Sequence, residues 1–262
     1  MESTHSRQDI SIIADDLGLL PSVNEGIFFA LKNRLIDGAS LMANGEAFDD
    51  AVRQCLENKY ENIGIHLVLV EEKPLTSMFF PKNHKTFFIK YLLGIIKRSD
   101  IEKELRAQLS KVISAGVKPV FINSHQHLHL LPGIMNATIK LSKEFGIPYI
   151  RLVTEPVLFR ERKLFRQVQL LFLNFLSWLA KRKIEKAGLR YNDFFVGFLN
   201  AGNFRIEDLE SAKKLNKTYP EKIIELGCHP GFNSQELVEK YGHWRYNWEK
   251  EIEVLKRKNN ED

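Results

Sequence analysis

Three histidines stand at alternate positions in the segment NSHQHLHLLPG, which covers residues 123–133. They are His125, His127 and His129, and they directly follow the apolar run KPVFI in a chain that has only eight histidines. Close His-x-His pairs recur in metal sites, because neutral imidazole is a common metal ligand. The alternative interpretation is a polar turn that happens to be rich in imidazole.

Three other apolar runs contain or end in residues that can do chemistry. Asp15 and Asp16 end the run ISIIADD. His66 lies within IGIHL, and His229 follows ELGC. Adjacent buried carboxylates are costly unless a cation or hydrogen-bond donors balance them. Taken singly, one aspartate could cap a helix, and each histidine could be a hydrogen-bonded core residue.

Taken together, these residues indicate a hydrolase. One carboxylate and two neutral imidazoles form a three-ligand metal site that leaves positions open for water and substrate. The second aspartate could then act as a base on water, and His229 as an acid from the opposite side. Spacing alone does not name the bond that is cleaved.

The candidate residues lie in or after apolar runs that are typical of buried strands. Such runs alternate with segments of helical apolar spacing, which implies parallel pairing with right-handed crossovers. Barrel active sites are assembled from the C-terminal ends of strands, so the placement of the polar motifs favours a barrel over an open doubly wound sheet. Seven strands are predicted, within residues 9–16, 38–44, 62–70, 118–125, 148–153, 192–199 and 222–232.

Two of the predicted helices carry end signals. The helix at residues 22–36 opens on a capping box of Ser22 and Glu25. The helix at residues 133–146 is closed by Gly146 in a left-handed cap. No repeat or linker interrupts the pattern, so residues 1–262 are predicted to form one α/β domain, with a variable helical segment at about 155–190.

The composition is that of a globular protein, with 44% apolar and 27% charged residues. Two cysteines, and an N-terminal segment without the apolar core of a signal peptide, predict a cytoplasmic protein. The net charge of +5 does not indicate nucleic-acid binding, because it is concentrated in one segment. Residues 160–190 hold nine Lys and Arg against two Glu, a local +7, so the remainder sums to −2.

The motifs ADDLGLLPSVNEGIFFAL, LMANGEAF, IGIHLVLVEEKPL, NSHQHLHLLPG, IPYIRL and CHPGF resemble the YdjC-like carbohydrate deacetylases, the group that contains chitooligosaccharide deacetylase and the hopanoid-biosynthesis-associated deacetylases. They occur in the order of that family and span roughly residues 9–232. The resemblance implies a deformed (β/α) barrel of the glycoside hydrolase/deacetylase type. It also implies metal-dependent hydrolysis of an N-acetyl group on a sugar or oligosaccharide, with release of acetate.

The same resemblance implies a role for each matching residue. Asp16, His66 and His125 would hold one divalent metal ion, with Asp15 as the general base and His229 as the general acid. The resemblance suggests Mg²⁺, whereas two imidazoles chemically favour Zn²⁺ or another transition metal.

Three further residues are predicted to support the site. Arg151, in IPYIRL, would orient the base, while His127 and Asn44 would contact the substrate or hold the metal ligands in place. His129 is predicted to be structural, with a hydrogen bond to the loop.

Two other functions remain open from the sequence. One is a metal-dependent phosphoesterase of the His-x-His kind, and the other is a carbohydrate-binding relative without turnover. The segment VQLLFLNFLSWLA, residues 168–180, has basic clusters on both sides and also allows two interpretations. It is either a buried barrel helix or homodimer contact, or a peripheral membrane contact that gives access to a lipid-linked sugar.

Overall fold

The computed structural model describes residues 10–77, 79–156 and 164–258, and its centre is a sheet of six parallel strands. The spatial order is β4 (Ile122–Ser124), β3 (Ile63–Leu67), β2 (Gly38–Leu41), β1 (Ile10–Leu17), β6 (Ile224–Cys228) and β5 (Phe194–Val196). The strand residues are almost all buried, as expected for a parallel sheet that is covered by helices on its outer side.

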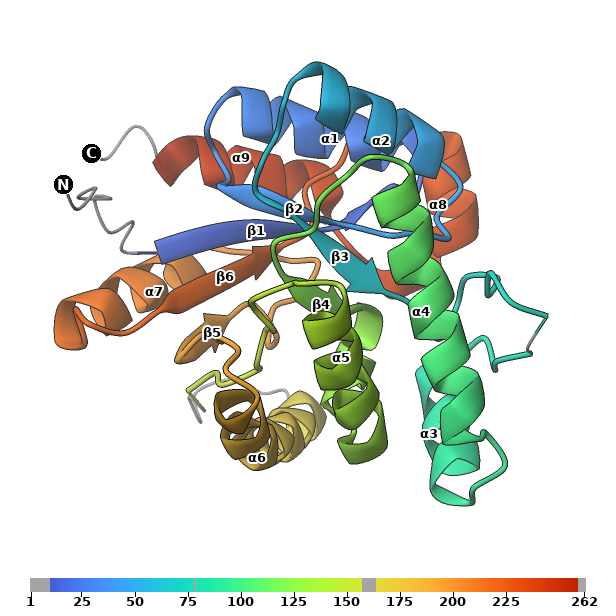
Figure 1. The fold of residues 1–262 in the computed structure, drawn as a ribbon. Coiled ribbons are helices and arrows are strands. Elements are labelled where there is room, and N and C mark those ends of the chain that lie inside the picture. The colour runs from blue at the N-terminus through green and yellow to red at the C-terminus, as the bar shows by residue number, and fades with distance from the viewer. Residues whose placement is uncertain (1–9, 78, 157–163, 259–262) are drawn as a thin grey trace, which may run out of the picture.

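Helices surround the sheet (Figure 1). They are α1 (Pro21–Lys32), α2 (Phe48–Glu57), α3 (His84–Leu92), α4 (Arg98–Ser114), α5 (Pro132–Glu144), α6 (Leu164–Lys186), α7 (Ile206–Thr218), α8 (Gln235–Tyr241) and α9 (Trp248–Lys258), with two 3-10 segments, η1 (His125–Leu130) and η2 (Gly242–Trp244). In Figure 1, α1, α2 and α9 lie above β1, whereas α5 and α6 lie below β4 and β5.

The two edges of the sheet are linked by the chain around residue 150. An isolated parallel bridge joins Ile150 to Ile122 of β4, and another joins Tyr149 to Arg190, which precedes β5. The sheet therefore curves into a barrel whose last gap is closed by two short bridges.

The predicted strand at residues 148–153 is reduced to these two bridges, so the sheet has six strands where about seven were predicted. The N–H groups of Ile150 and Arg151 donate to the carbonyls of Arg190 and Ile122, as in a strand ladder, but the next two N–H groups donate to side chains. The N–H of Leu152 donates to Asn192 Oδ1 at 2.7 Å, and the N–H of Val153 donates to Ser177 Oγ at 3.0 Å. Because these side chains satisfy them, the N–H groups of Leu152 and Val153 need no neighbouring strand.

One of the two predicted helix-end signals is confirmed. Gly146 follows the end of α5 with φ +70°, as a left-handed cap requires. The predicted capping box of Ser22 and Glu25 is wrong, because α1 begins at Pro21 and Ser22 already lies within the helix. Leu20 is its N-cap and Pro21 occupies the first turn, where the missing N–H of proline costs nothing.

The apolar segment at residues 168–180 lies within α6 and is not a buried helix. Many of its large apolar side chains are exposed, among them Trp178 at 66%. Within the described ranges, no helix combines the length and the hydropathy that a membrane span needs.

Candidate metal and catalytic site

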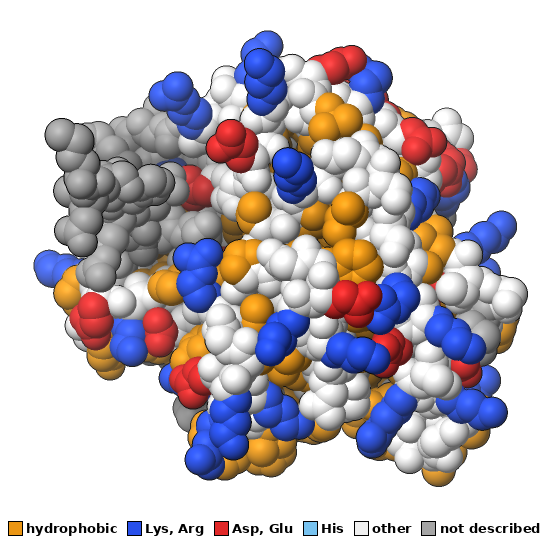
Figure 2. Space-filling view, viewed as in Figure 1, with side chains coloured by type: hydrophobic (Ala, Val, Ile, Leu, Met, Phe, Trp, Pro, Cys, Tyr) orange, Lys and Arg blue, Asp and Glu red, His pale blue; other side chains and the backbone are white. Residues whose placement is uncertain are grey.

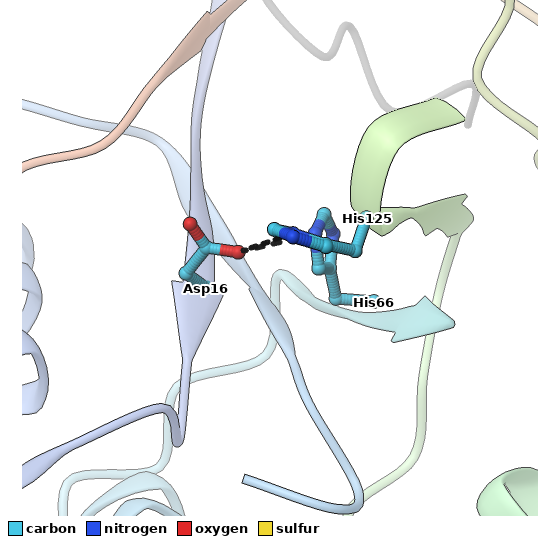
Figure 3. A group of neighbouring side chains, drawn as sticks. All are labelled: Asp16, His66 and His125. Carbon is cyan, nitrogen blue, oxygen red and sulfur yellow. Dashed lines mark hydrogen bonds and ion pairs between the residues drawn. The ribbon is translucent and has the colours of Figure 1, made fainter. Parts of the chain in front are cut away.

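Asp16, His66 and His125 converge at the C-terminal side of the sheet, from the end of β1, from β3 and from the start of η1. Each offers one ligand atom, and these atoms lie within 4.8 Å of one another. Asp16 Oδ1 is 3.3 Å from His66 Nε2 and 3.3 Å from His125 Nδ1 (Figure 3). All three side chains are buried. Such a group can hold a divalent cation.

The local backbone sets the direction of Asp16. The register between β1 and β2 shifts between Ala14 and Leu17, and Asp16 has φ +66°. This left-handed conformation is uncommon for a residue with a side chain, although aspartate tolerates it better than most. The irregularity lets two adjacent aspartates both serve the site, whereas in a regular strand they would point to opposite faces.

Hydrogen bonds orient both imidazoles. Asn123 uses its NH₂ group to donate to Asp15, so its Oδ1 accepts the proton on His66 Nδ1 at 2.7 Å. That tautomer leaves the lone pair of His66 Nε2 facing Asp16. His125 presents Nδ1 to Asp16, and its Nε2 lies 3.2 Å from Glu71 Oε2. A carboxylate behind a ligating histidine fixes the ring and strengthens it as a ligand.

The electrostatics favour a positive charge at this place. Burial works to lower the pKa of His125, but hydrogen bonds to Asp16 and Glu71 outweigh it and raise the pKa to about 10. Burial works to raise the pKa of Asp16, yet its contacts with His125 and His66 hold that pKa well below its usual value. A proton or a metal cation can supply the charge that these carboxylates require.

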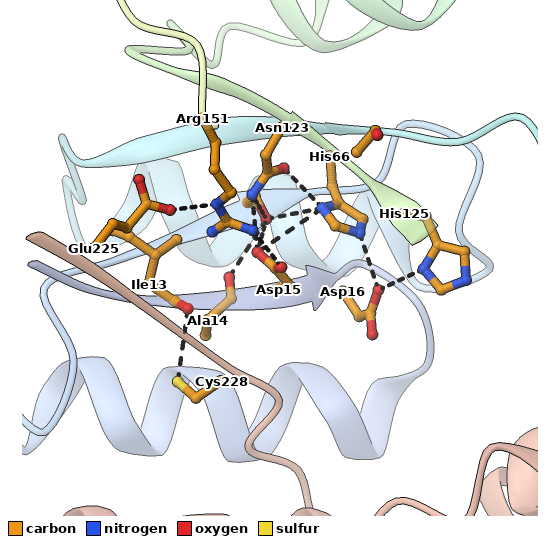
Figure 4. A network of polar contacts seen from close by, with 12 residues as sticks. Ile13, Ala14, Asp15, Asp16, His66, Asn123, His125, Arg151, Glu225 and Cys228 are labelled. Carbon is orange, nitrogen blue, oxygen red and sulfur yellow. Dashed lines mark hydrogen bonds and ion pairs between the residues drawn. The ribbon is translucent and has the colours of Figure 1, made fainter. Parts of the chain in front are cut away.

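Asp15 lies beside the candidate metal ligands and has a separate set of partners (Figure 4). Its Oδ1 accepts from Ser40 Oγ at 2.8 Å and from Asn123 Nδ2 at 2.9 Å. Its Oδ2 accepts from Arg151 Nη1 at 2.5 Å. Burial works to raise the pKa of Asp15, but the charge of Arg151 outweighs it, so the pKa lies well below the usual range.

Arg151 is completely buried and joins two carboxylates. Its Nε donates to Glu225 Oε1, and Tyr149 donates to the other oxygen of Glu225 at 2.8 Å. The guanidinium also lies over the ring of Phe195, 5.1 Å from its centre. A charge buried this deeply is tolerated because it is paired on both sides, and the pairing holds Arg151 against Asp15.

His229 follows β6, and its ring packs against Tyr246 with 4.9 Å between ring centres. Its backbone N–H donates to the buried carboxylate of Glu251. Tyr246 packs on Trp244, which in turn lies 5.0 Å from the ring of His125. An aromatic cluster from the C-terminal region thus connects His229 to His125, one of the candidate metal ligands.

The other predicted residues take different places. His129 is structural, because its Nε2–H donates to the carbonyl of Arg151 at 2.8 Å and its Nδ1 accepts from Ser124 Oγ at 2.6 Å. His127 has φ +53°, and its ring packs 5.7 Å from Phe198 in the wall of an apolar cavity of about 760 Å³. Alternation along the chain did not predict this, because η1 bends directly after His125.

Asn44 lies apart from the three candidate metal ligands, in the wall of a second cavity. This cavity has a volume of about 600 Å³, and Glu71, Glu72 and Tyr241 also line it. The NH₂ group of Asn44 donates to the carbonyl of Lys73 at 3.0 Å. Since Glu71 contacts His125, the polar cavity borders the candidate metal site.

Four residues of the site were not predicted from the sequence: Ser40, Glu71, Asn123 and Glu225. Ser40 and Glu225 are polar residues inside apolar strands, which is a signal of a buried partner. Asn123 belongs to the motif NSHQH but attracts less attention than the histidines. Glu71 lies at a turn with φ +74°, and no pattern of the sequence indicates its direction.

The chain is similar to known proteins over nearly its whole length. The family model described as YdjC-like protein matches residues 9–261. A carbohydrate deacetylase from Clostridium beijerinckii is 27% identical over 253 residues, which cover 94% of this chain and 90% of the relative. A carbohydrate deacetylase from Oceanobacillus iheyensis is 27% identical, over 94% of this chain and 95% of the relative. A carbohydrate deacetylase from Brevibacillus brevis is 35% identical over 139 residues, which cover 52% of this chain and 56% of the relative.

A solved structure has the same architecture. It is a crystal structure from Enterococcus faecalis described as a cellobiose-phosphate cleavage protein, with a TM-score of 0.69 and 20% sequence identity. The match covers 94% of this chain and 89% of the other. This likeness confirms the predicted α/β fold of the barrel type.

Proposed function

Because the chain belongs to the YdjC-like protein family, we propose that it is a carbohydrate deacetylase that hydrolyses the N-acetyl group of a sugar with the help of a divalent metal ion. The relatives named carbohydrate deacetylase support the reaction class. The observation that carries the metal-dependent mechanism is the convergence of Asp16, His66 and His125 beside Asp15, which is held by Arg151.

The residues fit a metal ion. Asp16 Oδ2 is buried and has no hydrogen-bond partner among the described residues, as expected for an oxygen that a cation would satisfy. Asp16, His66 and His125 would hold the ion. When bound, a divalent cation polarises the acetamide carbonyl and makes water more acidic.

Asp15 would accept the proton of the attacking water. Its lowered pKa keeps it ionised at neutral pH, which a base requires. Ser40, Asn123 and Arg151 hold the carboxylate in one orientation, so that it need not reorganise during the reaction.

His229 would give a proton to the departing amine. It enters from β6, whereas Asp15 enters from β1, the neighbouring strand of the sheet. Its Nδ1 is buried and has no hydrogen-bond partner among the described residues. Acetate and the free amino sugar are the products.

The polar cavity of about 600 Å³ would bind the sugar, since it borders His125 through Glu71. Its lining supplies carboxylates, an amide and a phenol, which are groups that bind sugar hydroxyls. Asn44 and Tyr241 would contact the substrate there.

Acetate release from a panel of N-acetylated sugars, including chitobiose, tests the proposal. The enzyme would be assayed as purified, after chelation, and after addition of Mg²⁺, Zn²⁺, Mn²⁺ or Co²⁺. We expect release that chelation abolishes and a metal restores. Hydrolysis of p-nitrophenyl phosphate without acetate release would favour a phosphoesterase. Sugar binding without turnover, in the presence of bound metal, would favour a non-catalytic relative.

A further inference from the structure

One face of α6 exposes an apolar stripe to solvent. Leu164, Val168, Leu171, Phe175 and Trp178 follow one another at intervals of four, three, four and three residues, which places them on one side of the helix. Each is at least half exposed. At a rise of 1.5 Å per residue the stripe is roughly 21 Å long.

The inward side of α6 carries both polar and apolar residues, and its buried residues are Gln167, Leu170, Leu176, Ser177, Ala180 and Ile184. Asn174 accepts from the backbone N–H of Glu155 at 3.1 Å and donates to its carbonyl at 2.9 Å. Ser177 accepts from the N–H of Val153, and Gln167 is buried as well. A surface helix normally buries its apolar side and exposes its polar side. α6 instead has apolar residues on both sides, and the polar residues on its inward side satisfy the backbone near the closure of the barrel.

α3 adds to this surface. Rings of the two helices meet where Phe88 lies 5.9 Å from Phe172. The α3/α6 face, as we define it, comprises Ile89, Leu92, Leu93, Ile95, Leu164, Phe165, Val168, Leu171, Phe172, Phe175, Trp178 and Leu179. These are twelve of the nineteen exposed large apolar residues in the described part of the chain. Figure 2 shows orange side chains over α6 and α3 along the lower edge of the molecule, with blue Lys and Arg beside them.

The charge around the α3/α6 face is almost entirely positive. α3 contains two lysines and no acidic residue, while α6 contains five Lys and Arg and a single acidic residue, Glu185. Lys85 lies over the ring of Phe165 at 5.7 Å, and Arg182 and Lys186 are exposed beyond Trp178. A symmetric dimer across this face would bring like charges together. An anionic lipid surface complements both the apolar stripe and its basic surroundings.

An apolar cavity lies between the two helices and the catalytic site. Its volume is about 760 Å³, and its walls include Phe88 from α3 and Phe172 and Leu176 from α6. Gln126 and His127, which directly follow the metal ligand His125, also line it. The cavity thus extends from the α3/α6 face to the chain segment that carries the site.

We propose that the α3/α6 face docks on an anionic lipid bilayer, and that the substrate is a membrane-embedded N-acetylated glycolipid whose apolar part enters the cavity of about 760 Å³. The substrate part of this inference rests on the proposed deacetylase function, whereas the docking part does not.

Flotation with lipid vesicles tests the docking without any need for activity. The full chain should float with vesicles of phosphatidylglycerol and phosphatidylcholine, and binding should weaken as salt is raised. The double variant Phe175→Glu/Trp178→Glu should reduce binding by about tenfold or more, because it places charge in the apolar stripe. Leu56→Glu on α2, at a position that is also exposed, should bind like the wild type. Absence of binding at low salt overturns the docking.

Light scattering after size exclusion separates this proposal from self-association. A monomer supports docking on lipid. A dimer that the double variant dissociates would show that the face is a contact between copies, and would overturn the proposal.

Acetate release from two glycosides tests the substrate class. Dodecyl N-acetylglucosaminide in anionic vesicles should be hydrolysed with a kcat/KM at least about tenfold higher than the methyl glycoside, since the alkyl chain adds apolar burial. Equal values overturn the glycolipid substrate. If neither glycoside releases acetate while vesicle binding is intact, the proposed function fails and the docking stands.

Discussion

Asp15 and Asp16 are neighbours in the sequence, but their surroundings give them different chemistry. Asp16 faces two imidazoles, and one of its oxygens has no hydrogen-bond partner in the part of the chain that the structure describes, whereas both oxygens of Asp15 accept from donors. The shift of register in β1 and the positive φ of Asp16 produce this difference. The local backbone would therefore suit Asp16 to the proposed role of metal ligand and Asp15 to the proposed role of base.

Isosteric variants separate these two roles. Asp15→Asn should lower kcat by roughly 10²- to 10⁴-fold and leave metal affinity nearly unchanged, because it removes a proton acceptor but no ligand. Asp16→Asn should weaken metal binding itself, because it removes the only carboxylate ligand of the group. Calorimetric metal titration and acetate release measure the two effects, with thermal melting to check folding. Equal loss of metal in both variants would contradict this division.

Glu71 is expected to act on the metal through His125. Glu71→Gln should weaken metal affinity by roughly 10- to 100-fold, because the ring of His125 loses the carboxylate that orients it and increases its basicity. Glu72→Gln is the matched control. The carboxylate of Glu72 accepts from Tyr241 at 2.5 Å and makes no hydrogen bond to a metal ligand. Competition with a chromogenic chelator measures both variants, and equal affinities for the two would contradict the role of Glu71.

The sequence indicates the residues of the site better than their directions. Asp15, Asp16, His66 and His125 lie in or after apolar runs, so their convergence follows from parallel strands alone. The direction of His127 depends on the bend of η1, where two residues have positive φ. The contact between Glu71 and His125 depends on a loop conformation. The spacing of residues in the sequence contains no information about this loop or about the bend of η1.

At the scale of elements, α6 shows where amphipathic patterns fail. Its apolar side is broad and its polar stripe narrow, a pattern that usually indicates a buried helix. Polar residues face inward there because they satisfy the backbone at residues 153–155. Ser177 accepts from the N–H of Val153, and Asn174 accepts from the N–H of Glu155 and donates to its carbonyl. Which side of a helix faces inward can thus depend on a segment that is distant in the sequence.

Two opposite substitutions on α6 test this orientation. Asn174→Leu should lower the free energy of unfolding by about 2–4 kcal/mol, although it makes the helix more apolar, because two backbone groups of Glu155 lose their partner. Leu171→Asn, at a position that is 51% exposed, should change it by less than about 1 kcal/mol. Urea unfolding followed by circular dichroism measures both. A larger loss for Leu171→Asn would mean that the apolar side faces the protein.

At the scale of the whole molecule, the charged network in the barrel interior connects distant parts of the chain. Asp15 on β1, Arg151 near the bridge and Glu225 on β6 are joined by direct ion pairs. The sequence predicts a barrel from the alternation of strands and helices. It misses that the ring closes through two isolated bridges, because a bridge of one residue pair has no pattern of its own.

We expect residues 1–262 to unfold as one domain, and the two cysteines can report on it. Cys55 on α2 and Cys228 on β6 are both buried, and burial raises the pKa of Cys55 to about 12 and that of Cys228 as well. Because the thiolate is the reactive form, neither should react with a disulfide reagent in the native protein. In low urea, each single-thiol variant, Cys55→Ala and Cys228→Ala, should be labelled at a rate set by global unfolding, equal within about threefold. Mass spectrometry after timed labelling measures these rates. Much faster labelling of Cys55 would show that the α2 region opens independently, and the chain would then consist of more than one cooperative unit.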